Sequence, residues 1–132
     1  MLHKNHLLWL LFALNHGAWC RTTRSHAKRL QPRGGAFSGE ARYYHLGTGS
    51  QTACGGHHTD TEMVCALGFM KFTQGKQCQQ SIKIYHGSKQ VTCQVHDACP
   101  SCAENSLDVS PSVFKALAPL EAGVLNVQWH FI

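Results

Sequence analysis

The sequence VHDACPSC at residues 95–102, followed by LDVSP at residues 107–111, places two aspartates around a Cys-Pro-x-Cys turn. Asp97 is predicted to end a strand and Asp108 to precede a helix, so both carboxylates are expected at one end of a β-barrel. A carboxylate acts as a general acid on a glycosidic oxygen when burial raises its pKa, and two carboxylates can divide the acid and base roles. A structural alternative stays open: Asp108 could cap the helix, and Asp97 could accept backbone N–H groups from a loop.

Short runs of alternating apolar and polar residues surround this region and predict strands. They cover Ala41 to Leu46, Met63 to Leu67, Ser81 to Tyr85, Gln90 to His96, and Leu125 to Phe131. One helix is predicted after Ser110 as N-cap and Pro111 as its first residue, with an apolar stripe made by Val113, Phe114, Leu117 and Leu120. Five or six short strands with one small helix favour a compact β-barrel, and the alternation of the last strand predicts that Trp129 lies in its core.

Cysteine usage indicates an exported, disulfide-stabilised domain. Six cysteines follow the basic N-terminal stretch, an even number that is typical of secreted disulfide frameworks: Cys54, Cys65, Cys78, Cys93, Cys99 and Cys102. Cys65 and Cys93 both take inward positions in separate strands, which predicts a disulfide between them. Closing that loop would stabilise the fold by roughly 3–4 kcal/mol.

The first twenty residues have the features of a secretory signal peptide. Lys4 precedes the apolar run Leu7 to Leu14, which is too short to span a bilayer, and the small residue Ala18 follows. We therefore predict a signal peptide at residues 1–20, a basic pro-segment or flexible linker at 21–38, and a single barrel domain at 39–132. A buried N-terminal helix and a solvated charged tail are the alternatives for the first two segments.

The distribution of charge excludes a nucleic-acid partner. The formal net charge is +5, but residues 1–29 contain five of the twelve basic residues and no acid. From Leu30 onward there are seven basic and seven acidic residues. This part of the chain therefore has no excess of positive charge with which to bind a polyanion. Cys99 and Cys102, together with His57, His58, His96 and Asp97, are ligands of the type that zinc prefers. An oxidising compartment favours disulfides over thiolates, so we expect no metal and no other cofactor.

Taken in order, several short motifs resemble the rare lipoprotein A-like double-psi β-barrel family, which includes relatives of expansins, barwin and kiwellin. They are TACG at 52–55, VCAL at 64–67, QC at 77–78, SIKI at 81–84, DACPSC at 97–102, LDVSPSVF at 107–114 and VQWHF at 127–131. The resemblance is strongest to the small secreted fungal members and covers residues 41–132. It implies a mainly β, six-stranded double-psi barrel, disulfide-stapled, with one or two short helices and a shallow groove.

The resemblance also implies a site. Asp108 matches the main polar residue of the groove in expansin-like members, and Asp97 is expected beside it. Tyr43 and Tyr44 match the tyrosine-containing first strand, where a ring could stack on a sugar, although strand alternation places one of the two in the core. His45 and His96 are further candidates for substrate binding. For the remaining cysteines we expect a bond from Cys54 or Cys78 to the Cys99/Cys102 turn.

Members of the family differ in activity, so the resemblance implies more than one possible function. Some are lytic transglycosylases acting on peptidoglycan, expansins loosen plant walls without hydrolysis, and related barrels act in defence or inhibit cysteine proteases. We expect a monomeric secreted protein that binds or remodels cell-wall polysaccharide of the cellulose, chitin or peptidoglycan type in an expansin-like, non-hydrolytic manner. Transglycosylase activity is left open. The alternative is a secreted effector or protease inhibitor that binds a host or target protein.

Overall fold

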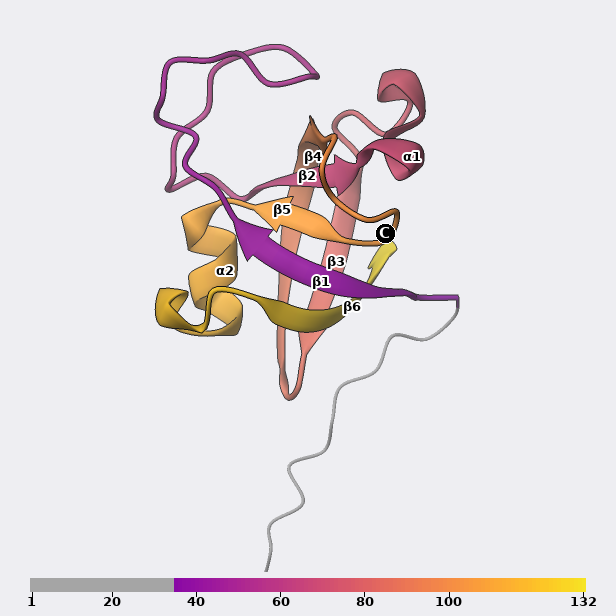
Figure 1. Cartoon of the computed structure of the whole chain (residues 1–132), viewed down its shortest axis with the longest axis vertical. Helices are drawn as coiled ribbons and strands as arrows, with labels where there is room; N and C mark the ends of the chain where they lie inside the picture. Colours follow the sequence, from indigo (N-terminus) through magenta and orange to yellow (C-terminus); the bar gives the residue numbers. More distant parts are fainter. Residues whose placement is uncertain (1–34) are drawn as a thin grey trace, which may run out of the picture.

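The computed structural model describes residues 35–132, in which six strands close into a barrel in the order β1-β5-β2-β4-β3-β6 (Figure 1). The strands are β1 (Phe37–Tyr43), β2 (Val64–Gly68), β3 (Ser81–His86), β4 (Lys89–Cys99), β5 (Leu107–Val109) and β6 (Leu125–Phe131). β1 pairs in parallel with β5, and β2 in parallel with β4, while the other neighbours are antiparallel. The predicted mainly β, six-stranded closed barrel is confirmed.

Two short helices accompany the barrel, α1 (Phe69–Phe72) and α2 (Pro111–Leu117), with 3-10 turns η1 (Thr73–Gly75) and η2 (Leu120–Ala122). The predicted start of α2 is confirmed, because Ser110 Oγ accepts a hydrogen bond from the backbone N–H of Val113 and Pro111 follows the cap. α2 covers one end of the barrel (Figure 1). There it buries Val113, Phe114 and Leu117.

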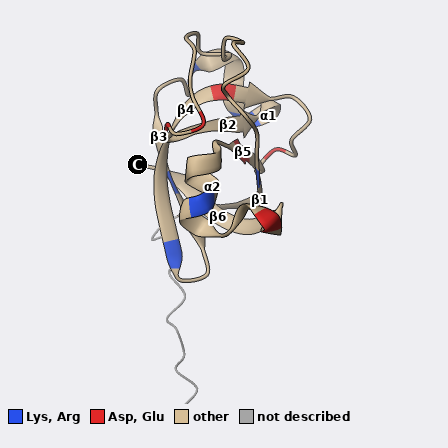
Figure 2. Ribbon diagram, turned by 90° about the vertical axis from the view of Figure 1, so that its left-hand side faces the viewer, with Lys and Arg blue, Asp and Glu red and all other residues tan. Residues whose placement is uncertain are grey.

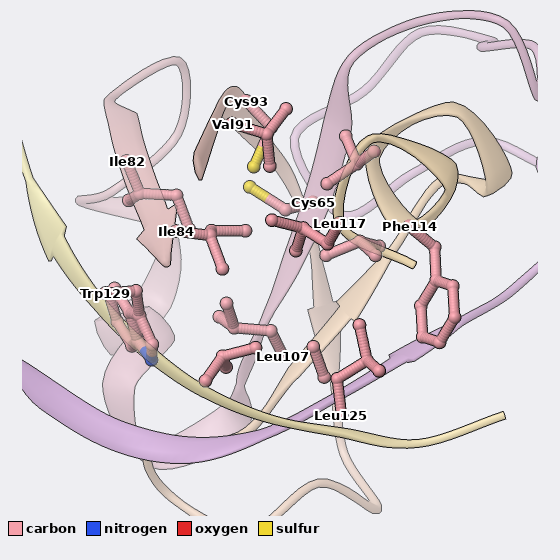
Figure 3. Close-up of a cluster of buried hydrophobic side chains, with 14 of the residues drawn as sticks. Cys65, Ile82, Ile84, Val91, Cys93, Leu107, Phe114, Leu117, Leu125 and Trp129 are labelled. Carbon is pink, nitrogen blue, oxygen red and sulfur yellow. The ribbon is translucent and has the colours of Figure 1, made fainter. Parts of the chain in front are cut away.

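The core follows the alternation of the strands. Val91, Cys93 and Val95 of β4 are buried whereas the intervening residues are exposed. The side chains of Ile82 and Ile84 from β3 meet them in the interior (Figure 3). Trp129 of β6 is fully buried, as predicted, and its indole N–H donates to the backbone carbonyl of Asn105 over 2.8 Å. This bond satisfies the one polar group that the ring carries into the core.

Strands β1 and β2 both differ from the sequence prediction. β1 begins at Phe37, four residues before the predicted start and two before the predicted domain boundary, and it ends at Tyr43. β2 does not alternate in burial, because all five of its residues are buried. A Cβ on Gly68 would lie 2.4 Å from the backbone oxygen of Ala103, so a loop covers that end of the strand from outside.

The disulfide prediction is wrong in its pairing. Cys54 is bonded to Cys78 and Cys99 to Cys102, while Cys65 and Cys93 are buried free thiols. Neither the Cys65–Cys93 bond nor a bond from Cys54 or Cys78 to the Cys99/Cys102 turn is present.

The topology explains both errors. Cys65 does face inward, but it lies opposite Val95 rather than Cys93. Cys93 is two residues before Val95 on β4, so the two cysteines are a diagonal pair rather than directly opposite each other. Figure 3 shows the two cysteine side chains directed toward each other inside the core. Cys54 instead meets Cys78 because Cys54 N–H bonds to His96 O, and Gln79 N–H, one residue after Cys78, bonds to Val95 O on the same strand.

The predicted signal peptide and residues 21–34 of the predicted linker lie outside the described residues. Within residues 35–132, no helix has the length and apolar character needed to cross a membrane. Figure 2 shows isolated basic and acidic segments on one side of the molecule, with no continuous stripe of either charge.

Candidate functional site

The two aspartates lie on either side of strand β2. Ala66 is opposite Asp97 of β4 on one edge and opposite Asp108 of β5 on the other. Residues paired in this way project from the same face of a sheet. Neighbouring strands are about 4.7–4.9 Å apart, so the two aspartates have Cα atoms roughly 9–10 Å apart. Arg42 of β1 is opposite Asp108 on its other side, and we call Arg42, Asp108, Ala66 and Asp97 the aspartate row.

A β-bulge brings Asp97 into this row. Cys65 pairs with Val95, but the next residue, Ala66, pairs with Asp97, so His96 is an extra residue in β4. Val95 points inward, and regular alternation would point Asp97, two residues later, inward as well. The extra residue at the bulge shifts the alternation, so Asp97 points outward. β4 therefore continues to Cys99, and Asp97 lies within the strand rather than at its predicted end.

Asp97 is fully engaged in structural hydrogen bonds. Its Oδ1 accepts the backbone N–H groups of Ala53 at 2.8 Å and Ala98 at 2.9 Å, and its Oδ2 accepts the Tyr44 hydroxyl at 3.1 Å. Burial, followed by the negative charge of Asp97, raises the pKa of Tyr44 well above its ordinary value. Tyr44 therefore stays protonated and acts as a hydrogen-bond donor. The contacts of Asp97 match the structural alternative given above, in which this residue holds a neighbouring loop in place.

Asp108 is the less satisfied of the two carboxylates. It is half-buried, and within residues 35–132 its Oδ1 is buried without a hydrogen-bond partner. Burial raises the pKa of Asp108, against the opposing effect of Arg42, and the charge of Asp97 raises it further. Ser110, not Asp108, caps α2, so capping does not account for this aspartate.

The tyrosine pair divides between core and site. Tyr43 packs edge-on against Phe114, with ring centroids 5.1 Å apart, at the margin of the core. Tyr44 donates its backbone N–H to Val109 O at the end of β5 and its hydroxyl to Asp97 of β4. Its side chain therefore extends across β2 in the neighbourhood of the aspartate row.

The two predicted histidines make other contacts. His45 is exposed, and its Nδ1 lies 2.6 Å from Asp60 Oδ2. His96 is the bulge residue, with its Nε2 2.8 Å from Gln94 Oε1 and its ring 4.3 Å from that of His58. Burial and the neighbouring His58 lower the pKa of His96. The structure thus gives both histidines partners outside the aspartate row.

Cys99, Cys102 and Asp108 are the one group of metal-type ligands that converges within the described residues, with ligand atoms inside 4.8 Å. The two sulfurs are joined in a disulfide. They therefore offer no thiolates, which are the form of cysteine that binds zinc. The group does not fit a metal centre.

Two hollows lie next to the row. The smaller, about 200 Å³, is lined by residues that include Arg42, Ser101 and Cys102. The larger, about 1140 Å³, lies further along β1 and β6. Asp97 and Asp108 line neither hollow, so the predicted groove does not take its walls from them.

Arg42, which the sequence analysis missed, alternates with Ala41 and Tyr43 in β1, and that alternation could have placed it on the outer face.

Known proteins share this architecture. Residues 36–129 match a family model described as lytic transglycolase, of the double-psi β-barrel type. Ripening-related protein 7 of Oryza sativa subsp. japonica is 32% identical over 96 residues, which cover 61% of this chain and 59% of that protein. The papain inhibitor of Streptomyces mobaraensis is 36% identical over 53 residues, 39% of this chain and 37% of the inhibitor. The matched segments thus span less than two thirds of these curated relatives.

Solved structures agree with the sequence matches. The Streptomyces papain inhibitor superposes with a TM-score of 0.65 at 26% identity, covering 76% of this chain and 97% of the inhibitor. An expansin of Clavibacter michiganensis, solved as a variant in complex with cellohexaose, superposes with a TM-score of 0.68 at 22% identity. That match covers 74% of this chain and 50% of the expansin, and at this identity it supports the fold alone.

Proposed function

This chain belongs to the lytic transglycolase family of double-psi β-barrels, and on that premise we propose that it is a secreted protein that binds cell-wall polysaccharide without hydrolysing it. The proposed site is the aspartate row with Tyr44. Asp108 is the group that contacts the sugar, and Asp97 holds the surrounding loop in place.

The observation that carries the proposal is the unused hydrogen-bonding capacity of Asp108. A buried polar atom without a partner is costly and calls for an explanation. The Asp108 Oδ1 atom is such an atom within residues 35–132. A sugar hydroxyl donates hydrogen bonds of the kind that this carboxylate lacks, and a hydrogen bond to a charged group is among the stronger ones.

The same contacts argue against hydrolysis. Glycosidases of the common type use two carboxylates, one as acid and one as base or nucleophile. Asp97 already accepts three hydrogen bonds, from Ala53, Ala98 and Tyr44. A carboxylate committed to its own loop is poorly placed to activate water, which leaves Asp108 as the one acid available for a reaction.

The relatives support an extracellular binding role. The expansin structure of the same fold contains cellohexaose. This chain has two disulfides, and disulfides are typical of proteins in oxidising compartments such as the extracellular space. Secretion and polysaccharide binding are proposed here by analogy with that expansin and from this chemistry.

Retention on insoluble polymers tests the proposal. Wild type and the Asp108→Asn variant are incubated with cellulose, chitin and peptidoglycan, and the bound fraction is measured across polymer concentrations. Asp108→Asn is expected to weaken retention about tenfold on the preferred polymer, as for a lost hydrogen bond to a charged group. Glu121→Gln, an exposed change in η2, is the matched control and should bind as wild type. Equal retention of all three proteins, or release of soluble sugar ends, would contradict the proposal.

A second candidate function is inhibition of a papain-like protease, and a specific feature favours it. Phe69 and Met70 project from α1 with 63% and 77% of their surfaces exposed, and adjacent exposed apolar side chains are typical of protein-binding surfaces. The match to the papain inhibitor covers 97% of that structure. Inhibition of papain that is lost in the double variant Phe69→Ser, Met70→Ser would support this function. Absence of inhibition by the wild type would exclude it for papain.

A further inference from the structure

The larger hollow has a floor made by three neighbouring strands. Ser38 of β1 is opposite Gln128 of β6, which is in turn opposite Tyr85 of β3, and Glu40 is opposite Asn126 in the next pair. These polar side chains alternate with the buried residues of the same strands, so they form part of the outer surface. The strand ladder fixes their spacing, and we call this site the Tyr85 hollow.

The walls of the Tyr85 hollow are also held in place. The loop at residues 103–106 lies so close to β1 that a Cβ on Gly39 would be 2.1 Å from the backbone oxygen of Asn105. Ser106 Oγ accepts the backbone N–H of Glu40 at 3.2 Å. On the opposite wall, His86 Nδ1 lies 2.9 Å from Asn126 O. The hollow is thus preformed, which reduces the ordering cost of binding.

The lining indicates a neutral ligand rich in hydroxyl groups. It contains no lysine or arginine, and its two carboxylates have cationic partners: Glu40 pairs with Arg42 at 3.0 Å and Glu104 with Lys71 at 3.4 Å. The amides of Asn126 and Gln128 offer both donors and acceptors. A site without free positive charge is unfavourable for phosphates and uronates.

An aromatic ring adds a surface for stacking. Tyr85 is half-buried in the floor, and its ring stacks on that of His130 with centroids 5.6 Å apart and planes inclined by 16°. The neighbouring ring restricts the orientation of Tyr85. Tyrosine combines an apolar face with a polar tip, which suits a sugar ring with its C–H face and hydroxyl rim.

The Tyr85 hollow adjoins the smaller hollow beside the aspartate row. Glu40, Ala103 and Ser106 line both hollows, and the smaller one reaches Arg42 in the aspartate row. A chain-like ligand lying at Asp108 can therefore pass Arg42 and Glu40 and continue to Tyr85.

We propose that the Tyr85 hollow is a second subsite for a neutral, unbranched polysaccharide whose chain extends from Asp108 along the outer face of β1 to Tyr85. This inference rests on the proposed function and narrows its ligand to a long neutral glycan. A short oligosaccharide occupies one end of the path, whereas a longer one contacts both ends.

A length series tests the inference. The full chain is titrated by calorimetry with cello-oligosaccharides and chito-oligosaccharides from disaccharide to hexasaccharide, and with a polygalacturonate hexasaccharide as the anionic comparison. For one neutral series the affinity is expected to rise with length, and Tyr85→Ala should weaken hexasaccharide binding about tenfold while leaving disaccharide binding unchanged. Gln128→Ala should act in the same direction. Lys115→Ala, exposed on α2, is the control, and Tyr85→Phe should retain most of the affinity because it keeps the ring.

The outcomes separate this inference from the proposed function. Binding that Asp108→Asn weakens, but that neither grows with length nor responds to Tyr85→Ala, would overturn the second subsite alone. A preference for the anionic series would overturn the neutral ligand class. Failure of every oligosaccharide to bind the wild type would overturn both proposals. Thermal unfolding of each variant shows whether a loss of binding reflects a loss of folding.

Discussion

At the scale of single residues, hydrogen-bond partners distinguish two aspartates that look equivalent in the sequence. Both oxygens of Asp97 accept hydrogen bonds, from two backbone N–H groups and a tyrosine hydroxyl, whereas Asp108 has a buried oxygen without a partner in the described part of the chain. Sequence spacing identified both acids but could not rank them. Their difference depends on Ala53 and Tyr44, which come from segments distant in the chain.

The raised pKa of Asp108 has a consequence for stability. Its folded pKa lies above the usual value of 3.8 because of burial, so the folded state holds this proton more tightly than the unfolded state. The free energy of unfolding is therefore greatest below the unfolded pKa and decreases as pH rises through the folded pKa. Asp108→Asn is expected to stabilise the protein at neutral pH, and the gain should vanish near pH ~3, as measured by urea unfolding.

Asp60 provides a control of opposite sign. Hydrogen bonds from His45 and the backbone lower the pKa of Asp60, so this carboxylate contributes stability above its unfolded pKa and loses it in acid. Asp60→Asn should therefore destabilise the protein at neutral pH. A destabilising effect of Asp108→Asn at neutral pH would show that its carboxylate has a favourable partner.

At the scale of elements, the hairpin of β3 and β4, the last strand and the capped helix α2 were all predictable, because each follows a local pattern. The bulge at His96 was not, since it appears only when β4 is paired with β2. The disulfides were missed for the same reason. Inward-facing cysteines are visible in a strand pattern, but the identity of the neighbouring strand, and therefore the pairing, is a property of the whole sheet.

Gly39 is the position where an added methyl group tests the contact between β1 and the loop at 103–106. A Cβ there would lie 2.1 Å from a backbone oxygen, so strand or loop must move. Gly39→Ala is expected to cost about 3 kcal/mol of unfolding free energy, as for a severe overpacking. Gly47→Ala, where nothing lies within 4 Å, should change it by less than ~0.5 kcal/mol. Urea unfolding of both variants makes the comparison, and similar values would show that the loop is not packed against β1.

At the scale of the whole molecule, the interior shields its two thiols. Cys65 and Cys93 are 0% and 2% exposed, and burial raises the pKa of Cys65, with a further contribution from Cys93. Because the thiolate is the reactive form, neither cysteine should react with iodoacetamide while the protein is folded. Both should be alkylated in denaturant without reductant, as measured by peptide mass spectrometry. A linked peptide containing both residues would contradict the free-thiol state.

The strand order also sets when this barrel can close. Within residues 35–132, strand β1 pairs with β5 and β6, the two described strands that are furthest from it in the sequence. During synthesis β1 therefore lacks both of these sheet partners until residues 107–131 have emerged from the ribosome. Folding dominated by such distant pairings is slow, and the growing polypeptide is open to aggregation and proteolysis throughout that interval. Closure of the ring therefore requires that β6 has already been synthesised.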